Sequence, residues 1–258
     1  MKKDDMRLQE FAFCGTTDDY QRTLEKLVDL AEPEPWTLPG GQKNAVLAKY
    51  VSGTFRQCYK QEKFLTTQDG QFTCFNTGLL TPNGHDILCV FQKNKRTDAQ
   101  EWVLRFFAGN DERKYMDLFS EVPKLATYTS RFEEFYFNPN YDFIISTDHI
   151  LDDNWDRIHD VVPLSKAIVK SLMIGVIEEA KRRIKRNLRL VVPQFYNNQI
   201  MYLVPIHIPI DDDKFITMAL AAELTQQKQY RANTIFTKEM AYEKARLLMK
   251  PESNWLIE

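Results

Sequence analysis

"QIMYLVPIHIPI" (residues 199–210) is the stretch that decides the fold of this chain. The alternate positions from Ile200 to Ile210 are all apolar or aromatic. Side chains two residues apart lie on the same face of a β-strand, so this pattern predicts a strand with one face in the core. The intervening positions, Met201 to Pro209, are also mostly apolar, and we expect that face to be covered too. His207, on this second face, is expected to be a hydrogen-bonded core residue.

The segments on either side of this strand predict a β-meander. "LRLVVPQFY" (residues 188–196) leads into a turn at Asn197 and Asn198. After the strand, the polar turns "DDDK" and "TQQKQ" alternate with the strand-like segments "FITMALAAEL" and "YRANTIF". A final helix is expected to begin near Thr237, because threonine is a good N-cap and Glu239 suits the positive end of the helix dipole.

A long helix is predicted immediately before the meander, over "LSKAIVKSLMIGVIEEAKRRIKRN" (residues 164–187). Apolar residues recur every four positions from Leu164 to Ile184, which is the spacing of a buried helical stripe. Gly175 lies within this stripe, and we expect it to mark a close packing contact.

The first half of the chain predicts two helices, over residues 18–31 and 42–60, separated by the Pro- and Gly-rich break "EPEPWTLPGG". The strand-like segments "FLTT", "QFTCFNTGLL", "DILCVFQ" and "EWVLRFFAG" follow, with turn signals between them. Because strands are grouped and flanked by helices, the sequence predicts an α+β fold with mostly antiparallel sheets. We expect a single domain spanning residues 1–258, with residues 1–40 as a helical N-terminal extension and the final helix capping the C-terminal meander.

Composition is that of an ordinary globular protein, with 43% hydrophobic and 27% charged residues and a net charge of −2. Attraction to nucleic acid must therefore come from a local basic patch. The four cysteines form no C-x-x-C pair, which indicates buried free thiols in a reducing compartment. The sequence shows neither a signal peptide nor an apolar run long enough to cross a bilayer. We expect a cytoplasmic protein without a membrane partner.

The strongest functional signal is "KRRIKRNLRLVVPQFY" (residues 181–196), in which six of the first nine residues are Lys or Arg. On a helix, Arg182, Arg186 and Arg189 share one side, and guanidinium groups bind phosphate oxygens well. Aromatic residues such as Tyr196 follow closely and are able to stack on nucleobases. The alternative interpretation is that these basic residues only favour the negative end of the helix dipole and the solvent.

A second candidate site lies in "TDHILDDNWDRIHD" (residues 147–160), where aspartates recur every four residues. His149 lies among them as a candidate general acid or base, and such residues are able to bind a divalent cation. The alternative is a solvated helical face, and the H-E-x-x-H zinc signature is absent. No metal or cofactor is predicted. Asn76, before Gly78 in "FNTGLL", marks either an anion-binding nest or a simple turn.

Taken together, several of these motifs resemble an uncharacterised bacterial domain family of about this length. The matching pieces are "FNTGL", "DHILDDNWDRI", "RRIKRN" with "PQFY", "YRANTIFTKEMAYEKARLL" and the closing "WL" at Trp255 and Leu256. Members of that family often lie beside cold-shock or LOTUS-type RNA-binding modules. The resemblance therefore implies an RNA-linked context.

The motifs of this resemblance contain most of the polar residues that we expect to bind a ligand. The expected ligand-binding residues are Asn76, Arg157, Arg182, Arg186, Asn187, Gln194, Tyr196, Tyr230, Arg231, Asn233, Thr237, Tyr242 and Arg246. The leading hypothesis is the binding, with or without processing, of RNA or a nucleotide-like phosphate ligand. The alternatives are a phosphoester hydrolase or transferase that uses His149, and a protein-interaction scaffold.

Overall fold

The structure is a computed structural model that describes residues 6–257. The chain divides into two compact units, residues 1–127 and residues 128–258, and each contains its own sheet. The single domain expected over residues 1–258 stays a prediction. It would require the two units to unfold together as one cooperative unit. No helix in the described range is long and apolar enough to cross a membrane.

The N-terminal unit is built on a five-stranded sheet with the order β1-β5-β4-β3-β2. β1 pairs in parallel with β5, and the other neighbours are antiparallel. Residues 6–31, within the stretch predicted to be a helical extension, contribute both helices and strand β1 to this unit. The elements are α1 (Leu8–Phe11), β1 (Ala12–Phe13), α2 (Thr17–Leu30), α3 (Ala45–Lys60), β2 (Leu65–Thr66), β3 (Phe72–Leu80), β4 (Asp86–Lys93), β5 (Trp102–Gly109) and α4 (Arg113–Met116).

Aromatic rings fill the face of this sheet that α3 covers. The Phe55 ring of α3 is fully buried, and its centroid lies 5.8 Å from that of Phe75 and 6.5 Å from that of Phe91. The cysteines are free thiols, as expected, and burial raises the pKa of Cys58 to about 12. A thiol with such a pKa stays protonated at neutral pH, so it is a packing group rather than a nucleophile.

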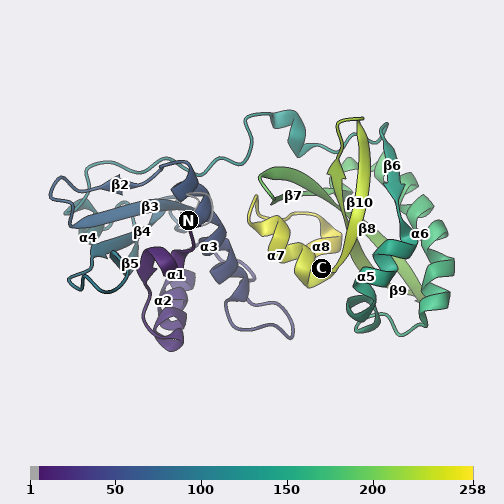
Figure 1. Cartoon of the computed structure of the whole chain (residues 1–258), viewed down its shortest axis with the longest axis horizontal. Helices are drawn as coiled ribbons and strands as arrows, with labels where there is room; N and C mark the ends of the chain where they lie inside the picture. Colours follow the sequence, from purple (N-terminus) through teal and green to yellow (C-terminus); the bar gives the residue numbers. More distant parts are fainter. Residues whose placement is uncertain (1–5, 258) are drawn as a thin grey trace. The chain divides into compact units, whose positions relative to one another are not determined.

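The C-terminal unit, coloured from teal to yellow in Figure 1, has a second five-stranded sheet. Its strand order is β6-β10-β9-β8-β7. Helices α5 and α6 pack against β10 and β8, and α7 packs against β7, β9 and β10. The elements are the 3-10 helix η2 (Phe132–Phe135), β6 (Asp142–Ile145), α5 (Thr147–His159), α6 (Lys166–Arg186), η3 (Leu188–Leu190), β7 (Val192–Tyr196), β8 (Gln199–Asp211), β9 (Lys214–Leu224), β10 (Gln229–Thr237), α7 (Lys238–Arg246) and α8 (Asn254–Ile257). The predicted α+β class and the C-terminal meander followed by a helix are confirmed.

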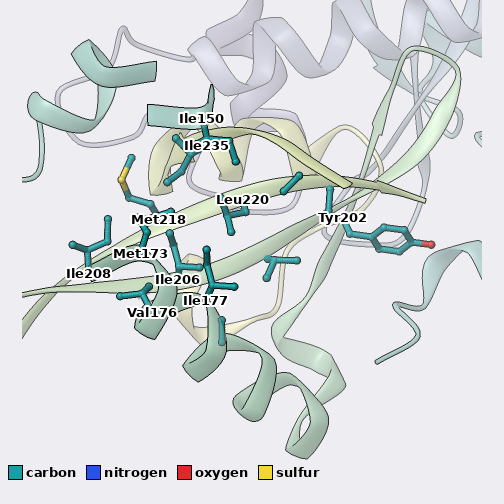
Figure 2. Packing of buried hydrophobic residues seen from close by; sticks show 14 of the residues in the cluster. Ile150, Met173, Val176, Ile177, Tyr202, Ile206, Ile208, Met218, Leu220 and Ile235 are labelled. Atoms are coloured by element: carbon teal, nitrogen blue, oxygen red, sulfur yellow. The ribbon is translucent and has the colours of Figure 1, made fainter. Parts of the chain in front are cut away.

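The core of the C-terminal unit lies where the sequence pattern of β8 predicts it. Ile206 and Ile208 pack with Met173 and Ile177 of α6, as Figure 2 shows. The second face of β8 is covered only in its first half, because residues 201–205 are buried whereas Pro209 is exposed. His207 is half-buried, and its Nδ1 lies 2.9 Å from Thr217 Oγ1.

Two short parallel strands are absent from the prediction. β6 pairs in parallel with β10 and lies just beyond residues 111–139, which carry no clear periodicity. β1 pairs in parallel with β5 over only two residues. Each strand is too short for an alternation of apolar and polar positions to be recognised in the sequence. Because of these two parallel pairs, both sheets are mixed rather than purely antiparallel.

The expectation of a close packing contact at Gly175 is wrong. A Cβ atom built on this residue would meet nothing within 4 Å. Gly175 is exposed in the middle of α6, where glycine costs conformational entropy without any compensating contact.

Gly175→Ala is therefore expected to raise the free energy of unfolding of the C-terminal unit by about 1 kcal/mol, the difference between Ala and Gly in an exposed helix interior. Urea denaturation followed by circular dichroism measures this change. A lower stability of the variant would contradict the open surroundings that the structure gives this position.

Candidate functional site

The basic run of α6 divides into side chains that face different surroundings. Ile184 is buried against the sheet, and at 3.6 residues per turn Lys181 and Lys185 lie on one flank of this buried stripe. Arg182 and Arg186 are exposed and point away from the core, and Arg186 Nη1 donates a hydrogen bond to the Arg182 carbonyl at 2.8 Å. The lysines are therefore the members of the run that border the neighbouring loop.

A pocket of about 400 Å³ lies between this flank of α6 and the segment that leads into β6. We call it the aromatic–lysine pocket, and its lining residues are Phe137, Pro139, Asn140, Tyr141, Asp142, Phe143, Glu178, Lys181, Ile184 and Lys185. Tyr141 and Phe143 are only half-buried, so their rings face the pocket with exposed surface. The pocket thus combines aromatic surface with two ammonium groups.

Stacked rings hold the aromatic wall of the pocket rigidly. The Phe137 ring stacks on Tyr230 with a centroid distance of 4.0 Å and an interplanar angle of 18°. The Asn138 N–H donates a hydrogen bond to the Tyr230 hydroxyl at 2.8 Å, and the Tyr202 hydroxyl donates one to the Glu134 carbonyl at 2.9 Å. Burial raises the pKa of Tyr202 to about 12 and also raises the pKa of Tyr230. Both hydroxyls stay neutral and serve to fix the loop.

The polar rim of the pocket carries charges of both signs. Lys181 Nζ lies 2.7 Å from Glu178 Oε1, and this hydrogen bond lowers the pKa of the Glu178 carboxyl. Lys185 makes no ion pair within residues 6–257, and neither does Asp142. Lys185 is therefore the ammonium group available to an anionic ligand, while Asp142 offers a free acceptor.

Four more of the predicted residues gather on the sheet face that α7 covers. Gln194 and Tyr196 come from β7, and Arg231 and Asn233 come from β10. Between them lies Glu223 of β9, which the sequence prediction missed. Its carboxylate accepts hydrogen bonds from Asn233 Nδ2 at 3.3 Å and from Gln199 Nε2 at 3.4 Å.

Helix α7 adds a cation to this face. The predicted residues Thr237, Tyr242 and Arg246 belong to this helix or its N-cap. Lys244 Nζ lies 5.5 Å from the centroid of the Tyr196 ring and 5.7 Å from that of Phe236. Thr237 is the N-cap of α7, as predicted, and its Oγ1 accepts a hydrogen bond from the Met240 N–H at 3.4 Å. Tyr242 and Arg246 of α7 are buried.

Three other predicted residues make contacts that brace the fold. Arg157 Nη1 donates hydrogen bonds to the Ile235 carbonyl at 2.6 Å and to Asn154 Oδ1 at 2.9 Å. Asn187 Oδ1 accepts a hydrogen bond from the Arg189 N–H at 3.1 Å, at the end of α6. Asn76 lies in the N-terminal unit, where its side chain bonds Asp86 Oδ1 and the Gly78 N–H. None of the three lines the aromatic–lysine pocket.

Most of the acidic segment forms α5, and several of its charged side chains are paired with neighbours. His149 Nε2 lies 3.3 Å from Asp153 Oδ2 on the same helix. Asp148 and Asp152 form ion pairs with Lys170 and Lys166 of α6, at 2.8 Å and 2.7 Å. Among the described residues, no group of three or more His, Cys, Asp or Glu side chains lies close enough to hold a metal ion.

The pocket residues that sequence reasoning missed are the lysines of the basic run and the loop from Phe137 to Phe143. The sequence favoured the arginines because a guanidinium binds phosphate with two parallel hydrogen bonds. Which cations border a cavity depends instead on how the helix packs on the sheet. The composition of "FNPNYDF" (residues 137–143), rich in aromatic and amide side chains, was the signal present in the sequence.

Comparison with known proteins gives one match. No curated protein and no solved structure matches the chain. A protein-family model described as "Domain of unknown function (DUF3825)" matches residues 27–255, which spans both units. The chain therefore belongs to this family, a domain of unknown function.

Proposed function

We propose that the C-terminal unit binds RNA or a nucleotide-like phosphate ligand in the aromatic–lysine pocket. One observation carries this proposal. Lys181 and Lys185 line the same cavity of about 400 Å³ as the half-buried rings of Tyr141 and Phe143. Cavities that bind small ligands typically have volumes of about 300–1,000 Å³, and this pocket lies within that range.

The aromatic rings and the lysine ammonium groups would bind different parts of such a ligand. A nucleobase stacked on an aromatic side chain gains about 1–3 kcal/mol, whatever its identity. An ammonium group attracts a phosphate as a point charge. With a net charge of −2 for the whole chain, this attraction is local to α6. The RNA-linked context implied by the family resemblance, from cold-shock and LOTUS-type neighbours, agrees with this ligand class.

The proposal concerns binding and assigns no catalytic step. His149, the candidate acid or base, does not line the pocket and is paired with Asp153. Arg182 and Arg186 are exposed on the same helix. In this proposal they contact the backbone of a longer strand rather than a mononucleotide.

The test is the binding of short single-stranded RNA and of mononucleotides at several salt concentrations. Each phosphate contact contributes about −0.7 to the slope of log affinity against log salt for a single strand. We expect Lys181→Ala with Lys185→Ala to flatten this slope by about 0.7 for the unpaired Lys185, and by less than that for Lys181, whose ammonium group is paired with Glu178. Tyr141→Ala should weaken binding with little change in slope, because stacking is not ionic.

The matched control is Lys166→Ala with Lys170→Ala, which removes the same charge from the other end of α6. The control should keep most of the salt dependence.

Arg182→Ala with Arg186→Ala distinguishes RNA from a mononucleotide as the ligand, since it should weaken the binding of RNA more than that of a mononucleotide. Equal effects of the Lys181/Lys185 pair and the control pair would refute a pocket site, and no binding by the folded wild type would refute the function.

A further inference from the structure

A second cavity, of about 460 Å³, lies on the other flank of α6, beside the hairpin formed by β8 and β9. We call it the hairpin groove. Its lining residues are Leu172, Gly175, Val176, Glu179, Arg183, His207, Pro209, Asp212, Asp213, Lys214 and Phe215. It shares no residue with the aromatic–lysine pocket.

The hairpin groove has apolar surface from both α6 and the hairpin, beside charged and polar residues. Pairing of β8 with β7 ends at Leu203, so the second half of β8 is an edge of the sheet. Phe215, at the start of β9, is 59% exposed although it is a large apolar side chain. Opposite this hairpin, Gly175 contributes no side chain, and the space where its Cβ would lie is empty.

The charges at the two ends of the groove differ. At one end, Glu179 and Arg183 neutralise each other, with Oε1 and Nη2 2.6 Å apart. At the other end, Asp212 and Asp213 make no ion pair within residues 6–257, and Lys214 is the only cation from the hairpin in the lining. The groove therefore carries more carboxylates than cations, with the excess at the hairpin turn.

His207 adds a neutral polar group between these two ends. Its Nδ1 is held by Thr217 Oγ1 at 2.9 Å, and its ring meets Phe215 edge-on with centroids 4.8 Å apart. Burial, followed by the positive charge of Arg183, lowers the pKa of this imidazole, while Glu179 opposes the shift. A neutral imidazole does not repel a cation, and one of its nitrogens remains available for a hydrogen bond.

We propose that the hairpin groove binds an organic cation, an ammonium ion that carries an apolar or aromatic group. The ammonium would lie near Asp212 and Asp213 and the exposed Phe215 ring, whose face attracts cations. The apolar part would cover Leu172 and Val176, and so remove their surface from water. The unpaired carboxylates disfavour an anion of the same shape, so charge is the property that selects the ligand.

The experiment compares three ligands of similar shape, phenethylammonium, phenethyl alcohol and 3-phenylpropionate, by ligand-observed NMR with the full chain at low salt. We expect phenethylammonium to bind most tightly and 3-phenylpropionate least. Asp212→Asn with Asp213→Asn should weaken binding of the ammonium ion by about fivefold for each carboxylate and leave the alcohol unchanged. Asp160→Asn, which removes one carboxylate at the C-terminal cap of α5, outside the groove, is the control and should change little.

Gly175→Leu tests the location, because it places a side chain in the groove without a backbone clash. Gly175→Leu should abolish binding. Gly175→Ala should bind nearly as well as the wild type, which would show that losing the glycine does not by itself prevent binding. Tighter binding of 3-phenylpropionate than of phenethylammonium would overturn the proposal. So would ammonium binding that survives both Gly175→Leu and the aspartate changes in protein whose circular dichroism is unchanged.

Discussion

Tyr230→Ala is expected to lower the free energy of unfolding of the C-terminal unit by about 3–5 kcal/mol, the cost of removing a large aromatic side chain from a core. The Tyr230 ring is 1% exposed and stacks on Phe137, and it also meets Tyr202 edge-on at 5.2 Å. Its hydroxyl holds the loop at Asn138, which leads into the aromatic–lysine pocket. Urea denaturation followed by circular dichroism measures the loss.

Tyr230→Phe is the matched variant, because it keeps the ring and removes only the hydrogen bond from the Asn138 N–H. We expect it to cost about 0.5–1.5 kcal/mol. The sequence hypothesis, in which Tyr230 contacts the ligand directly, predicts instead that Tyr230→Ala weakens RNA binding while stability changes little. A stable Tyr230→Ala protein with impaired binding would therefore contradict the structural assignment of this residue to the core.

Phe55→Ala is expected to destabilise the N-terminal unit by a similar amount, about 3–5 kcal/mol. Phe55 is fully buried and packs against the rings of Phe11, Phe64, Phe75 and Phe91. Phe13→Ala is the control in the same unit, because this side chain is 50% exposed and should cost only a small part of that amount. Similar losses from the two substitutions would contradict the placement of Phe55 at the centre of this core.

The Tyr230 and Phe55 variants together test the prediction of a single domain. If residues 1–258 unfold cooperatively, either variant shifts one common transition. If the two units unfold separately, each variant shifts only the transition of its own unit, and calorimetry separates the two cases.

The sequence by itself determined most of the elements. The alternation of apolar residues along β8 fixed which face enters the core, because a strand turns successive side chains to opposite sides. The period of the apolar stripe located α6, predicted over residues 164–187 and observed over Lys166–Arg186. Turn residues such as Asn197 and Asn198, which adopt positive φ angles, correctly separated β7 from β8. These signals are local, so they can be read without knowing which segments pair.

The candidate sites depended on contacts between segments far apart in the chain. The sequence marked the basic run, but only the packing of α6 on the sheet showed that Lys181 and Lys185 border a cavity, while Arg182 and Arg186 face the solvent. The other wall comes from the loop before β6, a strand held in place by parallel pairing with β10. That pairing joins segments separated by more than eighty residues, and its register is set by the two partner backbones together. Periodicity within one segment contains no information about such a partner, so the tertiary structure alone decided where the pockets lie.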